Sequence, residues 1–519
     1  MIETADDAIP ETETVSKSSL MAWLDRAIVF WVFVLALAAP HSIAATQIAW
    51  LCGMAVWGAR FLLRPRPRLP RTPVDFPLLG FLLLTVISSF LSYDPGVSLG
   101  KLRAASLFSI AYLVAGNVLR KRVLHLLVLT IIASCMINVF CTLGERVVGR
   151  GVRVEGVSEN SPLRAAVFVT ADQREDPTPI QSGDTILEID GRPLKNPEAL
   201  VATLDDPTYP PTDFLLAKIY RVEWTPVLKI PRRRLLPGTT ILERLGVASW
   251  SPGREWRAAG FYGHYTTYAE TLQLIASLAL GLFIANVRKR KLHAVLLLLA
   301  LAGMAGALLL TVTRASWVAF LLSAFVITLV GTRRRTAIAV AAFAIPVVLI
   351  GLFVLQQQRN VGFYDRSDHS IIWRETVWRE GFNLLRSKPR HLLVGVGMDS
   401  IKGHWREWGL FDQGRLPLGH MHSTPLQIAL ERGVPALVLW ILFVAVYARM
   451  LLRLARRREL DWIQRGLVLG ALGGLAGFIA SGMVHYNFGD SEVVMIFYFI
   501  MGLSLAVEQG LRDRGENHM

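Results

Sequence analysis

The chain has 519 residues, a formal net charge of +15 and a composition that is 53% hydrophobic, with a positive mean hydropathy. It contains about a dozen apolar runs long enough to cross a hydrocarbon core of roughly 30 Å, which excludes an ordinary soluble domain. The sequence predicts an all-α polytopic membrane protein with about 12 transmembrane helices. Since the arginines and lysines lie between these runs, we expect them to set the orientation of the spans in the membrane. We expect membrane lipids as partners and no nucleic acid.

The apolar runs define the predicted spans in chain order. Residues 1–24 are polar and predict a cytoplasmic tail without a cleavable signal peptide. The spans that follow are residues 26–41, 43–63, 76–92, 102–119, 123–144, 265–286, 292–312, 315–331, 337–355, 433–452, 465–485 and 490–508. The predicted organisation is a tail (1–24), transmembrane helices 1–5 (25–145), a folded insert (146–236), a loop with transmembrane helices 6–9 (237–355), a large loop (356–430), and transmembrane helices 10–12 with a cytoplasmic tail (431–519).

Basic residues occur in alternate connections between the spans. Runs such as Arg120-Lys-Arg122 and Arg333-Arg-Arg335 contrast with Ser92–Ser98 and His485–Asp490, which have almost no basic residues. By the positive-inside rule both termini are cytoplasmic, and the long segments at about 145–262 and 356–430 lie on the outer face. The three cysteines, Cys52, Cys135 and Cys141, fall in apolar runs without a CxxC pair, so neither a structural disulfide nor a zinc site is expected.

The first outer segment predicts a small α+β domain. Its expected elements are strands at 151–157, 183–193, 214–220 and 227–230, and a helix at 196–204 capped by Asn196 with Pro197 at its first position. The segment resembles an envelope-type PDZ domain through Ser161-Pro162, Gly183-Asp184, Ile186, Ile189, Asp190-Gly191, Pro193 and Leu200. It departs from that pattern by an insertion at 167–179 and by having no clear glycine-rich loop before the first strand. The resemblance implies either a peptide or protein partner bound by strand addition, or a rigid spacer.

Several motifs flank the outer ends of the later spans. They are Arg257 within 253–271, Thr313-Arg314-Ala-Ser-Trp317, an Arg374-Glu-Thr-Val-Trp378 segment that begins a short amphipathic helix, Leu393-Val-Gly-Val-Gly397, and the run from His420-Met-His422-Ser423 through Leu426-Gln427 to Gly433-Val-Pro435. In order, spacing and sidedness they resemble the O-antigen ligase and polymerase superfamily of bacterial membrane proteins. Ser423 departs from the Asn that is commoner after the histidine. The resemblance covers about residues 20–145 and 255–508.

The resemblance implies a glycosyl-transferring enzyme of the bacterial inner membrane, active at its periplasmic face. The donor would be a polyprenyl-diphosphate-linked glycan, and the acceptor a hydroxyl of lipid A core, of a polysaccharide or of a protein. Arg314 and Arg374 are the expected catalytic arginines, because a guanidinium can contact phosphate with two donors at once. Arg257 and Trp378 are expected to bind substrate. Alternatives remain open: lipid contact for Arg314, a solvated helix face for Arg374, and a salt bridge to Glu255 or Glu270 for Arg257.

His422 is the expected general base, since an imidazole titrates near neutral pH. His420 competes for that role and is otherwise expected to bind substrate with Ser423, while a structural role for His422 stays open. His404, His420 and His422 could be read as a metal site, but no carboxylate stands at ligand spacing, so no metal and no cofactor are expected. The alternative function is a non-catalytic polysaccharide transporter or a PDZ-bearing membrane sensor or scaffold. A transporter would place ionisable residues near the middle of broken spans, whereas here they collect at span ends.

Overall fold

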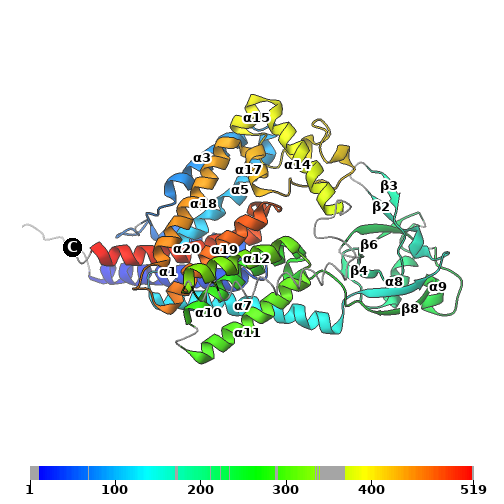
Figure 1. The fold of residues 1–519 in the computed structure, drawn as a ribbon, viewed down its shortest axis with the longest axis horizontal. Coiled ribbons are helices and arrows are strands. Elements are labelled where there is room, and N and C mark those ends of the chain that lie inside the picture. The colour runs from blue at the N-terminus through cyan, green and yellow to red at the C-terminus, as the bar shows by residue number, and fades with distance from the viewer. Residues whose placement is uncertain are drawn as a thin grey trace, which may run out of the picture.

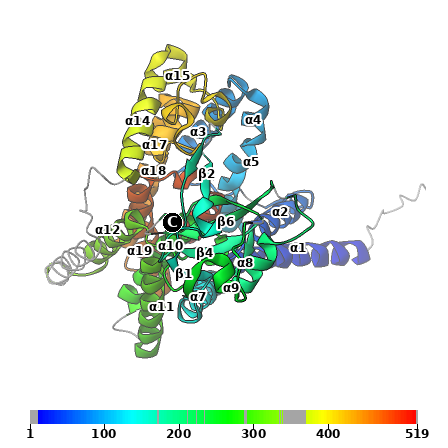
Figure 2. The ribbon, with the colours of Figure 1, turned by 90° about the vertical axis from the view of Figure 1, so that its right-hand side faces the viewer.

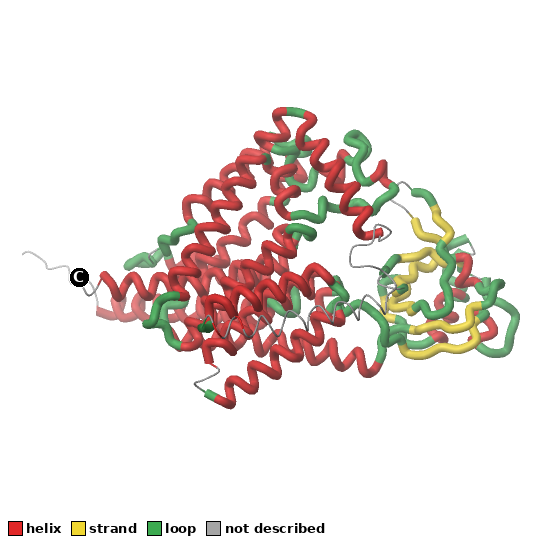
Figure 3. Tube along the Cα trace, in the orientation of Figure 1, coloured by secondary structure: helices red, strands yellow, loops and turns green. Residues whose placement is uncertain are grey.

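The computed structural model describes residues 11–516, except 68, 170–172, 211, 222–223, 233, 287–289, 334, 336–337 and 339–368. Most of the described chain is helical, and a single sheet lies at one end of the molecule, as Figure 3 shows. The predicted span at 337–355 and the first part of the large loop, 356–368, lie outside the described residues apart from Ile338.

Among the described residues, nine helical segments are long and apolar enough to cross a membrane, which confirms a polytopic membrane protein. They are Ser19–Ala38 within α1 (Glu11–Ala38), Pro95–Asn117, α7 (Lys121–Val148), α10 (Tyr265–Asn286), α11 (Lys291–Leu310), α12 (Arg314–Gly331), α18 (Val434–Ala455), α19 (Trp462–Gly482) and Ser491–Arg514 within α20 (Ser491–Glu516). The predicted second and third spans form α2 (Ile43–Arg60) and α3 (Asp75–Phe90), of 18 and 16 residues, outside that set of nine.

The fourth predicted span differs from a single continuous helix. It begins earlier and is divided into α4 (Pro95–Gly100), α5 (Leu102–Ala105), η1 (Ser106–Phe108) and α6 (Ser109–Asn117). Asp94 caps the first piece, since its carboxylate accepts from the Val97 amide, and Pro95 occupies the first turn. This division places Lys101 between two short helices rather than inside a straight span.

The centre of the helical body is formed by α10, α19 and α20. In each of these three helices 78% of the apolar segment is buried, compared with 28–50% in the other six candidate spans among the described residues. Small residues allow α10 and α19 to approach closely: a Cβ on Gly281 would lie 2.3 Å from the Gly466 carbonyl oxygen and 2.4 Å from the Gly470 nitrogen. The functional residues near the ends of α10 and α20 therefore rest on a tightly packed base.

The insert folds as an antiparallel sheet with the order β3-β2-β7-β6-β4-β1-β8, with β5 paired to β4. The strands are β1 (Val152–Val157), β2 (Val167–Val169), β3 (Glu175–Pro177), β4 (Thr185–Ile189), β5 (Arg192–Pro193), β6 (Phe214–Tyr220), β7 (Val227–Pro231) and β8 (Val247–Pro252). The expected helix is α8 (Pro197–Leu204), and the Asn196 side chain accepts from the Ala199 amide as predicted. Alternating side chains of β6, such as Leu215, join α8 in the core of this domain.

The sheet continues past residue 236, where the sequence suggested that the insert ends. Helix α9 (Ile241–Leu245) and β8 follow, and β8 pairs with β1 from Val157 opposite Val247 to Val152 opposite Pro252. Leu245 and Val247 are buried in the same core as the other strands. Strand β8 was missed because Val247–Pro252 lacks strict alternation of apolar and polar residues, in keeping with the exposure of all but its first residue.

The described part of the large loop forms a helical cap. It contains α14 (His369–Ser387), α15 (Pro389–Val394), α16 (Ile401–His404), η4 (Asp412–Gly414) and α17 (Thr424–Arg432). Figures 1 and 2 show α14, α15 and α17 together at one corner of the molecule beside α3 and α18, apart from the sheet. Helix α14 begins five residues before Arg374, where the expected helix began. Gly433, with a φ of +84°, separates α17 from α18.

Candidate functional site

A cavity of about 440 Å³ lies where the helical cap meets α3, α5, α10 and α20. Helix α3 contributes Phe81 and Leu82 to its lining. The polar residues of the lining include Lys101, His264, Thr267, Glu270, Asp399, Lys402, His420, His422, Gln427, Glu431, Arg432, His485, Tyr486, Asp490 and Glu492. Such a concentration of titratable groups in one hollow is typical of a binding or active site.

The Gly-x-Gly motif directly precedes Met398 and Asp399, which line the cavity. The amides of Val396 and Gly397 donate to the carbonyls of Leu430 and Glu431, at 2.8 and 2.9 Å, and so occupy acceptors at the end of α17. Gly397 has a φ of +100°, and a Cβ there would lie 1.8 Å from Ser92 Oγ. The motif is therefore required for close packing, and it fixes the direction of the last residues of α17.

His420 and His422 line the cavity, with their ring centroids 4.1 Å apart. Two hydrogen bonds fix the backbone of Met421, which lies between the two histidines. Trp378 Nε1 donates to the Met421 carbonyl at 2.8 Å, and the Met421 amide donates to Gln427 Oε1 at 2.7 Å. His422 packs edge-on against Trp373, with 4.1 Å between centroids. Trp378, predicted to bind substrate, thus contacts the histidine segment directly.

Both rings are held in the neutral form. Burial lowers the pKa of His420 to about 4, with a further contribution from the charge of Lys402. Burial also places the pKa of His422 far below its ordinary value, followed by the effects of His420, His485 and Arg374. A neutral imidazole can accept a proton, and an anion beside Arg374 would offset that charge and raise the pKa of His422.

A buried carboxylate–histidine pair lies next to these rings, and the sequence analysis missed it. His485 Nδ1 is 3.0 Å from Glu270 Oε1, and both side chains are buried. Arg374 Nε donates to the carbonyl of Val484, the residue before His485, at 3.3 Å. Burial, then the charges of Arg374 and Arg257, lowers the pKa of His485 to about 3. A signal was present in the sequence, since Glu270 and His485 both stand at the outer ends of predicted spans.

The structure brings Arg257 and the start of α12 together. Arg257 donates to the carbonyls of Thr311 and Val312, at 3.1 and 2.8 Å, and stacks on the Tyr265 ring at 3.4 Å. Arg314 follows directly as the half-buried first residue of α12. Glu255, one expected partner of Arg257, pairs with Arg153 at 3.2 Å. Arg257, Arg314 and Arg374 are not among the described residues that line the cavity, although Arg374 affects His422 within it.

The remaining predicted residues are placed as follows. Ser423 is buried at the start of α17, where its carbonyl accepts from the Gln427 amide at 2.9 Å. His404, which the sequence analysis considered together with His420 and His422 as a metal site, has other neighbours. Its Nδ1 contacts Glu407 at 2.9 Å, and its ring stacks on Trp408. Within the described residues, no group of three His, Cys, Asp or Glu is placed to hold a metal ion.

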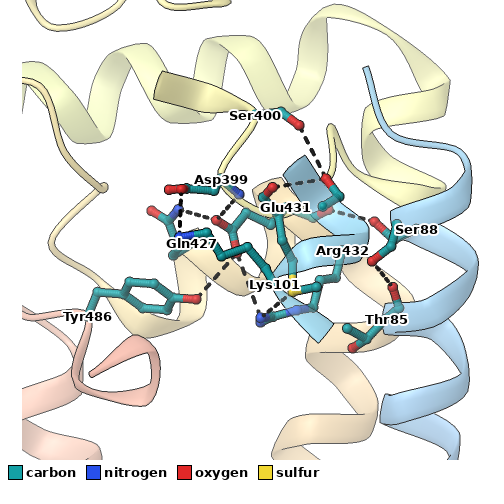
Figure 4. A network of polar contacts seen from close by, with 12 residues as sticks. Thr85, Ser88, Lys101, Asp399, Ser400, Gln427, Glu431, Arg432 and Tyr486 are labelled. Carbon is teal, nitrogen blue, oxygen red and sulfur yellow. Dashed lines mark hydrogen bonds and ion pairs between the residues drawn. The ribbon is translucent and has the colours of Figure 1, made fainter. Parts of the chain in front are cut away.

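A second polar network, shown in Figure 4, contributes to the cavity lining and was also missed by the sequence analysis. Glu431 Oε1 accepts from Gln427 Nε2 at 2.8 Å and from the Asp399 amide at 3.0 Å, while Tyr486 donates to Oε2 at 3.3 Å. Lys101 and Lys402 each lie 2.9 Å from the Asp399 carboxylate. These residues come from three distant stretches of the chain, so spacing in the sequence could not show that they meet.

Comparison with known families bears on the function of this cavity. Residues 298–441 match the family model described as O-antigen ligase. This chain resembles the O-antigen ligases. The O-antigen ligase match includes Arg314, Arg374, His420 and His422, and supports membership of that superfamily and a role in glycosyl transfer. It does not reach Arg257 or the sheet, and no curated protein matches the chain.

Proposed function

We propose that the chain is an inner-membrane enzyme that moves a glycan from a polyprenyl diphosphate to an acceptor hydroxyl at the periplasmic face. The observation that carries this proposal is the cavity in which neutral His420 and His422 lie beside the Arg374 segment, within the part that matches O-antigen ligases. The acceptor is a lipid A core, a growing polysaccharide or a protein hydroxyl.

The proposed reaction is a direct displacement without a metal. The acceptor oxygen bonds to the anomeric carbon as the bond from that carbon to the diphosphate oxygen breaks, which inverts the configuration. His422 takes the hydroxyl proton, with His420 as the competing base, and the leaving diphosphate departs on the polyprenyl carrier. Arg257, Arg314 and Arg374 offset its charge. Ser423 is proposed to contact substrate, and Trp378 to hold the histidine segment through Met421.

The Glu270–His485 pair supports the arginine side of this arrangement. Glu270 holds the His485 side chain, and Val484 is the residue before His485. The pair therefore also fixes the Val484 carbonyl, to which Arg374 donates. Thr424 adds a second attachment, since its amide and hydroxyl both donate to the His485 carbonyl at 3.1 Å. We therefore assign the pair a positioning role.

The sheet is proposed to be a PDZ-like domain on the periplasmic side that binds a peptide or protein partner or serves as a rigid spacer. Support comes from the antiparallel sheet, from the capped α8 against it, and from strand β3, which pairs on one side only among the described strands. An exposed strand edge can accept a further strand.

The test is an analysis of surface glycans in a strain that lacks this chain, with the wild-type chain or His422→Ala returned to it. Loss of polymer from lipid A with retained lipid-linked polymer identifies a ligase, and single unpolymerised units identify a polymerase. Loss from protein alone identifies a protein glycosyltransferase. Normal glycans in the deletion strain and in the strain that carries His422→Ala would reject the enzyme assignment and favour the transporter or sensor.

A further inference from the structure

A buried arginine in the cavity wall has hydrogen-bond donors that the described residues do not satisfy. Arg432 is 7% exposed and lines the cavity. Its Nη2 lies 3.2 Å from Met398 Sδ and 3.8 Å from Glu431 Oε2. Nε and Nη1 have no hydrogen-bond partner within the described part of the chain. Buried donors left unpaired are unfavourable, more so when they are charged, so a ligand oxygen at this wall would be strongly favoured.

Two further cations stand on the same wall. Lys101 and Lys402 line the cavity, their side chains are about half exposed, and both contact Asp399. Burial by itself would raise the pKa of Asp399, but its contacts with Lys402 and Lys101 lower that pKa below the ordinary value. The wall thus presents three cations to two carboxylates, Asp399 and Glu431, and retains positive charge. Glu270 and Asp490 also line the cavity, from other parts of the chain. Glu270 contacts His485, and Asp490 accepts from the Thr267 hydroxyl.

The Arg374 segment and this wall approach the histidine pair through different neighbours, since Trp373, the residue before Arg374, packs on His422 at 4.1 Å between centroids. After burial, Lys402 is the leading influence on His420, whereas Arg374 acts on His422 and His485. His420 packs against Tyr486 at 5.5 Å between centroids, and Tyr486 donates to Glu431 beside Arg432. One histidine thus contacts the Arg374 segment and the other contacts the residues beside Arg432. A base that removes a proton from the acceptor must lie between donor and acceptor.

We propose that Lys101, Lys402 and Arg432 form a subsite for an oxyanion carried by the acceptor, either a phosphate or a carboxylate next to the hydroxyl that is glycosylated. The proposal rests on the proposed function. Glu431 holds Arg432 from one side through Oε2, and the Gln427, Asp399 and Tyr486 contacts keep Glu431 in place, so the guanidinium is presented to the cavity before a ligand binds. An acceptor without an oxyanion would leave Nε and Nη1 of Arg432 without a charged hydrogen-bond acceptor.

The experiment measures binding directly and so does not depend on transfer activity. Full-length protein in detergent, carrying Arg374→Ala so that the proposed diphosphate site contributes little, is titrated with inorganic phosphate, with glucuronate and with uncharged glucose while its unfolding temperature is followed. We expect saturable stabilisation by phosphate or glucuronate and none by glucose. Stabilisation by phosphate alone indicates a phosphate-bearing acceptor, and stabilisation by glucuronate indicates a carboxylate.

Variants then locate the bound anion. We expect two variants to lower the affinity for the anion by at least about tenfold each, which corresponds to about 1.4 kcal/mol. One is the double variant Lys101→Gln with Lys402→Gln, and the other is Arg432→Gln. Lys195→Gln, an exposed lysine in the sheet domain, is the matched control. If Arg432→Gln fails to fold, the lysine pair decides, because both lysines are half exposed. No saturable binding, equal binding of glucose, or unchanged binding in the lysine variant would overturn the subsite. Surface glycans that change in the deletion strain would still support the enzyme.

Discussion

At the scale of single residues, His422 combines a neutral ring with a fixed backbone. We expect His422→Ala to reduce transfer by roughly 10²–10⁴-fold, the usual contribution of a general base. Surface glycans of a complemented deletion strain measure the loss, and an unchanged unfolding temperature shows that the protein still folds. An active His422→Ala protein beside an inactive His420→Ala protein would move the role to His420.

Arg314 and Arg374 provide a second residue-level prediction. We expect Arg→Ala at either position to abolish transfer, because losing one partner of a desolvated charged pair weakens binding by roughly 2–5 kcal/mol. Arg→Lys should also be badly impaired, since lysine keeps the charge but not the two parallel donors. Transfer is measured as for His422. Wild-type activity of the Arg374→Lys protein would show that charge alone suffices at that position.

The buried histidines also predict how stability depends on pH. The pKa values of His420 and His485 are about 4 and 3 in the folded chain, below the ordinary value of 6.5, so the unfolded chain binds more protons. Stability is therefore full above about pH 6.5 and falls as the pH drops toward 4, by about 2 kcal/mol for each histidine at pH 5. Unfolding temperatures between pH 7.5 and 5 measure the slope. His420→Gln and His485→Gln should flatten it, whereas His404→Gln, outside the cavity lining, should not.

At the scale of elements, the Gly395–Gly397 segment connects α17 to the link between α3 and α4. Besides its contacts to α17, the Val396 carbonyl accepts from the Tyr93 amide at 3.1 Å, and Ser98 Oγ donates to the Met398 carbonyl at 2.9 Å. The segment thus ties α17, the helix that follows His420 and His422, to the broken fourth span, which supplies Lys101. This explains why a motif without any chemically reactive side chain stands beside the site.

Gly397→Ala is expected to disrupt this connection. The new Cβ would overlap Ser92 Oγ at 1.8 Å and would require a positive φ, so we expect a loss of roughly 2–4 kcal/mol. Gly403→Ala is the matched control, because a Cβ there meets nothing within 4 Å. Unfolding temperature and limited proteolysis of the cap compare the two. Equal stability of both variants would show that the segment tolerates displacement.

At the scale of the whole molecule, the sheet has its own core, separate from that of the helical body. The buried residues of β1, β4, β6, β7 and α8 form one cluster, which also contains Leu245 and Val247 from beyond the expected boundary. Two residues of this domain, Leu187 and Tyr220, pack instead with the helical body. The domain is therefore attached at a small surface while its interior is independent.

A fragment of residues 148–253 is expected to be soluble and to unfold cooperatively. A fragment that stops at residue 236 should be less stable by several kcal/mol, because it loses β8 and leaves β1 without its outer partner. Circular dichroism during heating compares the two. Equal midpoints would show that α9 and β8 are dispensable, and a disordered longer fragment would show that the helical body is needed for folding.

The sequence by itself determined the membrane class, nine of the predicted spans, the main strands and helix α8, because hydrophobic runs, alternation and caps act over a few neighbouring residues. It also pointed to Arg374, His420 and His422, which lie in or beside the cavity. Only the tertiary structure decided the rest. The Glu270–His485 pair and the wall of Lys101, Lys402 and Arg432 join residues up to 331 positions apart. No local pattern encodes such a contact, since it depends on how α3, α10, α17 and α20 pack.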